Sequence, residues 1–92
     1  MTREYAKKQL ETSTDLAMNN QLSTVTFFQT NLITDEVNYY TSYFNNNMEL
    51  QDYMYKKLAK LESMFIPYCC YVDGSLYQSS GDMLFDDHKS NL

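Results

Sequence analysis

The clearest hydrophobic pattern lies in residues 48–65. Large apolar side chains recur there every three or four residues, at Leu50, Met54, Leu58, Leu61 and Phe65. This spacing places them on one face of a helix. Asn46 precedes the segment as a suitable N-cap, with Glu49 three residues later as in a capping box, and Pro67 disfavours helical backbone at the residue before it. The pattern therefore predicts a helix over residues 48–65.

The segment from Thr2 to Asn19 also has the spacing of a helix, with a thinner apolar face. Ala6, Leu10 and Ala17 share that face, and Lys and Glu are mixed around the rest. Residues 12–14 are Thr-Ser-Thr, whose mediocre helix propensity leaves a break open at that point.

The middle of the chain, residues 22–44, fits two patterns. As a helix it would present a broad apolar face made of Val25, Phe28, Leu32, Ile33, Val37, Tyr40 and Phe44. As a strand, residues 23–28 are rich in β-branched and aromatic side chains. Because hydrophobic and polar positions alternate poorly, a helix is favoured. The remaining alternative is an extended piece up to about Thr30, followed by a helix capped by Thr34.

After Pro67, two short β-prone runs flank Asp73-Gly74, a pair that tolerates the positive φ angles of a tight hairpin turn. We therefore expect a β-hairpin near residues 68–78. Together these elements predict a mainly α fold, with α+β left open, in which two or three helices pack as a small bundle beside a C-terminal hairpin. Residues 1–85 would form one domain, and residues 86–92 a flexible acidic tail.

Length and cysteine usage point to the cytoplasm. The 92 residues contain no apolar run near the roughly 18 residues of a membrane span, and no apolar segment follows the basic N-terminus. The two cysteines, Cys69 and Cys70, are adjacent and cannot connect distant segments as a disulfide framework would. They are expected to be buried thiols in a reducing compartment, which is the host cytoplasm if the gene belongs to a phage.

The charge distribution argues against direct nucleic-acid binding. The net charge is −5, and residues 9–55 contain no Lys or Arg, so most of the surface should repel phosphate. The composition, rich in Tyr, Asn and Met, is typical of AT-rich genomes such as those of phages and plasmids. Neither nucleic acid nor a membrane is an expected partner.

No residue pattern predicts catalysis, a cofactor or a metal site. The only histidine, His88, is the fifth residue counted from the C-terminal end, and two glycines cannot form a phosphate-binding loop. Acidic residues near His88 lack the spacing of a calcium loop, and two cysteines are too few for a zinc site. The sequence therefore predicts a protein that is not an enzyme.

Tyrosine is the remaining unusual feature, with nine in the chain. Tyrosine is favoured at interfaces, although some would simply flank a small core. The candidate partner-binding residues are Asp35, Glu36, Tyr39, Tyr43, Glu49, Asp52 and Tyr53. They suggest a small acidic protein-binding module, such as a phage- or plasmid-encoded inhibitor of a host protein that handles nucleic acid. A self-assembling accessory protein that forms a homodimer and an immunity or antitoxin-type protein are the alternatives.

Overall fold

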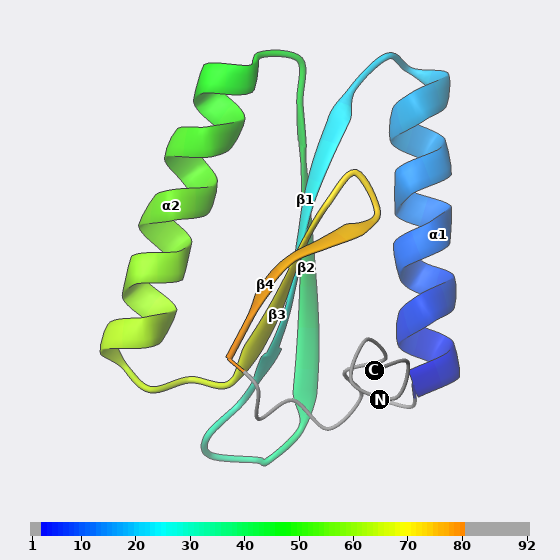
Figure 1. Cartoon of the computed structure of the whole chain (residues 1–92). Coiled ribbons are helices and arrows are strands. Elements are labelled where there is room, and N and C mark those ends of the chain that lie inside the picture. The colour runs from blue at the N-terminus through cyan, green and yellow to red at the C-terminus, as the bar shows by residue number, and fades with distance from the viewer. Residues whose placement is uncertain (1–2, 81–92) are drawn as a thin grey trace.

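In the computed structural model, which describes residues 3–80, two helices lie on opposite sides of a four-stranded antiparallel sheet (Figure 1). Along the chain the elements are α1 (Arg3–Asn19), β1 (Ser23–Thr30), β2 (Val37–Phe44), α2 (Asn47–Ser63), β3 (Tyr68–Val72) and β4 (Ser75–Ser79). The strand order is β2-β1-β3-β4, so β1 and β3 are central and β2 and β4 form the edges. The fold is α+β.

The predicted helical bundle is wrong because the middle of the chain forms β1 and β2. Residues 24–28 of β1 are all buried, since each face of this strand is covered by a helix. A strand buried on both faces needs no alternation of apolar and polar residues, which is why the pattern looked helical. The alternative reading was right about an extended piece up to Thr30, but the residues that follow form a loop and a second strand.

The loop between β1 and β2 explains why no helix starts at Thr34. The Asn31 side chain accepts hydrogen bonds from the backbone N–H groups of Ile33 and Thr34, at 2.9 and 3.2 Å. Asp35 then adopts a φ of +61°, which reverses the chain direction. Strand β1 then pairs antiparallel with β2, from Ser23 opposite Phe44 to Thr30 opposite Val37. Pairing between these two segments replaces the predicted helix.

The helix predicted over residues 48–65 is present as α2. Asn46 caps it, because its side-chain oxygen accepts hydrogen bonds from the N–H groups of Met48 and Glu49. Leu50, Met54, Leu58 and Leu61 are buried, as the spacing predicts. The helix ends slightly earlier than expected: Phe65 has a φ of +57° and is exposed.

The N-terminal helix, α1, continues without a break through residues 12–14. The hydroxyls of Thr12, Ser13 and Thr14 each donate a hydrogen bond to the carbonyl four residues earlier. The hydroxyl groups of these three side chains therefore find their hydrogen-bond acceptors within the helix.

The hairpin expected at Asp73-Gly74 is formed by β3 and β4. Both turn residues have positive φ, +50° and +83°, as a type I′ turn requires. Asp73 also joins the hairpin to β1, since its carboxylate accepts from the Thr24 N–H at 3.0 Å. The expected tail at residues 86–92 lies outside the described residues.

The sheet separates two hydrophobic clusters. Between α2 and the sheet lie Val25, Phe27, Leu50, Met54, Leu58, Leu61, Tyr68 and Cys70. Between α1 and the sheet lie Ala6, Phe28, Val37 and Cys69. Neither described helix is long and apolar enough to cross a membrane.

Candidate protein-binding site

The structure does not bring the seven predicted partner-binding residues onto one surface. Asp35 and Glu36 lie in the loop before β2, whereas Glu49 and Asp52 lie on α2 after the strand has ended. An eight-residue strand spans about 25 Å, so the first pair of acids is separated from Glu49 along the molecule. No single acidic face results from these residues.

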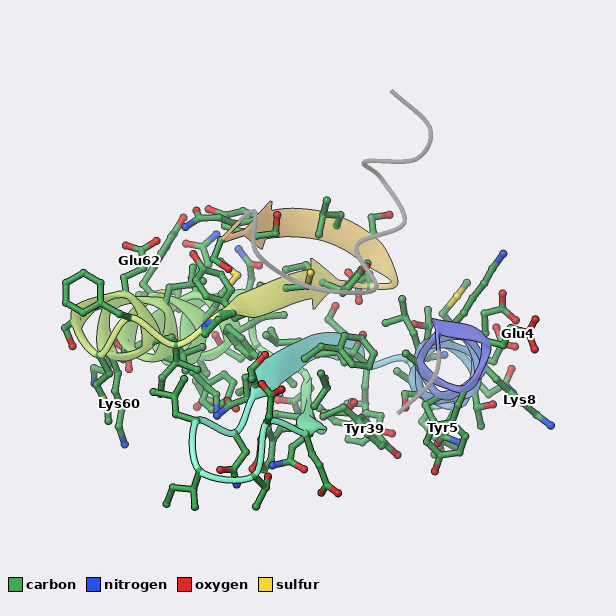
Figure 2. All side chains as sticks on the ribbon, turned by 90° about the horizontal axis from the view of Figure 1, so that it is seen from below. Glu4, Tyr5, Lys8, Tyr39, Lys60 and Glu62 are labelled. Atoms are coloured by element: carbon green, nitrogen blue, oxygen red, sulfur yellow. The ribbon has the colours of Figure 1, made fainter. Side chains whose placement is uncertain are left out.

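The three predicted tyrosines are divided between the two faces of the sheet. Tyr39 and Tyr43 are four residues apart on β2, and side chains of a strand alternate between its two faces. Both tyrosine side chains therefore lie on the face toward α1. Tyr39 packs on Phe28 with ring centroids 6.0 Å apart and donates its hydroxyl to Gln9 Oε1 at 2.9 Å; it points toward α1 (Figure 2). Tyr53 lies on the other side, packed against Phe44 and Phe27. Tyr39 and Tyr53 are partly buried and have structural contacts.

Tyr40 and Lys57 were missed from the sequence and form a contact beside β2. The Lys57 Nζ lies 4.6 Å from the centre of the Tyr40 ring and 5.4 Å from that of Phe27. Burial lowers the pKa of Lys57, and the nearby charge of Lys60 lowers it further. Tyr40 nonetheless remains 44% exposed. The helix predicted over this segment would have placed Tyr40 on its apolar face.

Lys57 also lines an open hollow of about 570 Å³ between α2 and the end of β1. Lys56 and Lys60 line the same hollow together with Gln29, whose side-chain Oε1 is buried and has no hydrogen-bond partner within residues 3–80. Lys56 forms an ion pair with Asp52 at 2.9 Å, which satisfies one of the three ammonium groups. The hollow is thus one of two basic clusters among the described residues; the other, Arg3, Lys7 and Lys8, lies on α1.

A second hollow, of about 390 Å³, lies at the far end of α2 beside β4. Glu62 Oε1 accepts from the Tyr68 hydroxyl at 2.7 Å and from Gln78 Nε2 at 2.8 Å. Burial and the hydrogen bond to Glu62 raise the pKa of Tyr68 to about 12. Glu62 and Lys60 project from different sides of α2 (Figure 2). This network is internally satisfied and holds α2 to the hairpin.

Among the described residues that line the two hollows there is no cysteine. Burial raises the pKa of the Cys70 thiol to about 12, so it stays protonated near neutral pH. Between residues 3 and 80, no three His, Cys, Asp or Glu side chains are grouped so as to hold a metal ion. The acidic residues near His88 lie outside this range.

The outer edge of β2 is the most open binding element of the sheet. Within the described part of the chain, β2 pairs only with β1. The strand VNYYTSYF carries no charged residue, no Pro and no Gly, and its pairing with β1 has no irregularity. Edge strands of this kind are templates for pairing with another chain.

The outward-facing backbone groups of β2 can be identified from the neighbouring strand. On β1, the N–H of Thr30 donates to the Pro67 carbonyl, and the Thr24 carbonyl accepts from the Asp73 N–H. The backbone N–H and C=O groups of even-numbered β1 residues therefore point toward β3. Odd-numbered residues of β1 therefore bond to β2, where they lie opposite even-numbered residues. The N–H and C=O groups that point away from the sheet belong to Val37, Tyr39, Thr41 and Tyr43.

The opposite edge, β4, is less suited to pairing. It has five residues, and its register with β3 shifts between Cys70 and Tyr71. Irregular, short edges resist addition of another strand.

No protein-family model, curated protein or solved structure matches this chain.

Proposed function

We propose that this chain is a small protein-binding module acting in the cytoplasm, and that its contact surface is the outer edge of β2. The observation that carries the proposal is the uncharged, aromatic and regular edge strand, with four residues whose backbone groups point outward. Addition of an extended protein segment to such an edge gives affinity through main-chain hydrogen bonds.

Aromatic side chains on both sides of β2 would add contact area. Tyr40 and Tyr43 are 44% and 41% exposed, and they point to opposite faces of the sheet. A segment added beside β2 would cover both rings partly, which supports a protein rather than a small molecule as the partner. An inhibitor, immunity or antitoxin-type protein could use this edge, whereas the separation of the predicted acids gives little support to a purely acidic contact surface.

The test compares Thr41→Pro with Thr41→Ala in capture of partners from a nuclease-treated bacterial lysate. The Thr41 N–H points away from β1, so proline removes an outward donor while the pairing with β1 is kept. Both variants lose the hydrogen bond between the Thr41 and Thr26 hydroxyls, which makes alanine the matched control. We expect specific partners, which include untagged copies of the chain itself, to be lost with proline and retained with alanine.

A third variant separates this proposal from an acidic contact surface. It carries Asp35→Asn, Glu36→Gln, Glu49→Gln and Asp52→Asn. If this variant loses its partners while Thr41→Pro retains them, the binding surface is the acidic one and the proposal is wrong. Amide spectra of each variant would establish that the fold is intact.

A further inference from the structure

The open edge of β2 has the properties needed to pair with itself. Self-pairing about a two-fold axis requires the same strand to serve as both template and added strand, so its outward groups must match when one copy is reversed. Outward residues occur at 37, 39, 41 and 43, which is a set symmetric about Tyr40. Reversal therefore places every outward residue opposite another outward residue.

From this symmetry we propose that the occupant of the β2 edge is a second copy of this chain, joined antiparallel so that the two sheets become one of eight strands. This inference rests on the proposed function of the edge. Val37 of each copy pairs with Tyr43 of the other, and Tyr39 pairs with Thr41. All eight outward N–H and C=O pairs of the two strands are then used, more than in any register displaced along the strand.

Aromatic contact favours the same register. With the axis at Tyr40, the two Tyr40 residues lie directly opposite each other as a pair without mutual backbone hydrogen bonds, where side chains come closest. Aromatic pairs at such positions stabilise sheets. Each ring is also covered by the Lys57 ammonium of its own chain, at 4.6 Å.

The charges at the two ends of β2 determine the direction of pairing. Asp35 and Glu36 precede the strand, whereas Phe44 and Asn45 end it without charge. A parallel pair would bring four carboxylates of the two copies together. In the antiparallel pair, each acidic loop lies beside the uncharged end of the other strand, so the acidic loops of the two copies are kept apart.

The charge of the chain restricts where two copies can meet. Two copies with a net charge of −5 each repel one another over most of their surfaces. Dimerisation is therefore confined to a surface without carboxylates, and β2 is an eight-residue strand of that kind.

The first measurement is the molar mass in solution, by sedimentation or light scattering, between about 1 and 100 µM, a range in which modest interfaces assemble. We expect twice the 10.9 kDa of the chain at the upper end. Thr41→Pro should weaken dimerisation by about a hundredfold, because one outward donor is lost from each copy and its acceptor is left unpaired. Thr41→Ala should remain dimeric.

The second measurement tests the register with a disulfide. Tyr40→Cys should form a cross-link between chains on mild oxidation, because the two positions face each other across the axis at a distance a disulfide can span. Ser42→Cys is the matched control: it lies on the same strand and the same face but would be opposite Asn38, so it should cross-link far more slowly. Cys69 and Cys70 are buried and do not interfere.

Each outcome decides the proposal. A wild-type chain that stays monomeric at 100 µM, a dimer unaffected by Thr41→Pro, or equal cross-linking at positions 40 and 42 would overturn it. If the chain is monomeric but loses another captured protein with Thr41→Pro, self-pairing is wrong while the binding edge stands. If no variant of the edge alters either dimerisation or capture, both proposals fail.

Discussion

The two faces of the sheet are packed by different kinds of side chain. The face toward α2 is filled by large apolar residues from every adjoining element, such as Phe27, Leu58 and Tyr68. The face toward α1 has small residues from the helix, Ala6 and Ala17, and buried hydroxyls from the sheet at Thr24 and Thr26. The α2 face therefore supplies most of the apolar burial, while the α1 face allows close approach of a helix to the sheet.

Close approach at the α1 face is visible at the β3–β4 turn. A Cβ added to Gly74 would lie 3.0 Å from Thr14 Oγ1 of α1, so the turn and the helix are nearly in contact. Thr26 forms a hydrogen bond with Thr41 at 3.0 Å, whereas Thr24 Oγ1 is buried with no hydrogen-bond partner among the described residues. This face should contribute less to the stability of the fold.

The largest expected change in the free energy of unfolding comes from truncating one leucine to alanine on each face of the sheet. Leu58→Ala should lower the free energy of unfolding by about 3 kcal/mol, since Leu58 is buried and its removal leaves a cavity. Leu10→Ala should cost only about 1 kcal/mol, because Leu10 is partly exposed at the edge of the α1 cluster. Urea unfolding measures both. Equal losses would show that the two faces stabilise the fold alike.

Alkaline pH should destabilise the α2 face through Cys70. Its pKa is about 12 in the folded chain against an ordinary 9.0, so the protonated thiol favours folding. This contribution is complete below pH 9 and is lost progressively as the pH rises toward 12, with a loss of about 1 kcal/mol at pH 10. Cys70→Ala should flatten that slope in unfolding experiments from pH 7 to 11. Tyr68, whose pKa is raised in the same direction, would contribute to the slope that remains.

The smallest effect is expected at the α1 face. Tyr39→Phe keeps the ring on Phe28 but loses the hydrogen bond to Gln9, which should cost about 0.5 kcal/mol in a partly exposed position. Tyr40→Phe is the control, because its ring stays beneath Lys57 and stability should not change. A loss for Tyr40→Phe as large as that for Tyr39→Phe would contradict this account of the two rings.

Local signals predicted α2 and the hairpin correctly because each has its own start or turn residue. Asn46 caps one and Asp73-Gly74 turns the other, and both act within a few residues. The strands β1 and β2 were missed because their pattern depends on distant elements. β1 is buried on both faces only when α1 and α2 are in place, which no window of sequence shows.

The candidate site was predicted in part for a reason independent of secondary structure. Tyr39 and Tyr43 are four residues apart, a spacing that gives a shared face on a helix and also on a strand, so the pair stayed together. Tyr40 was assigned to a helix core and is instead exposed beside Lys57. Its position depends on β2 being an edge strand, a property of the assembled sheet.

The same alternation of side chains along a strand separates the two adjacent cysteines. Cys69 belongs to the cluster beneath α1 and Cys70 to the cluster beneath α2, so the sheet itself separates two neighbouring sulfur atoms. A strand holds such neighbours on opposite sides, and they cannot join each other while β3 remains extended. A thiol-reactive dye that labels one sulfur before the other would reveal which helix leaves the sheet first.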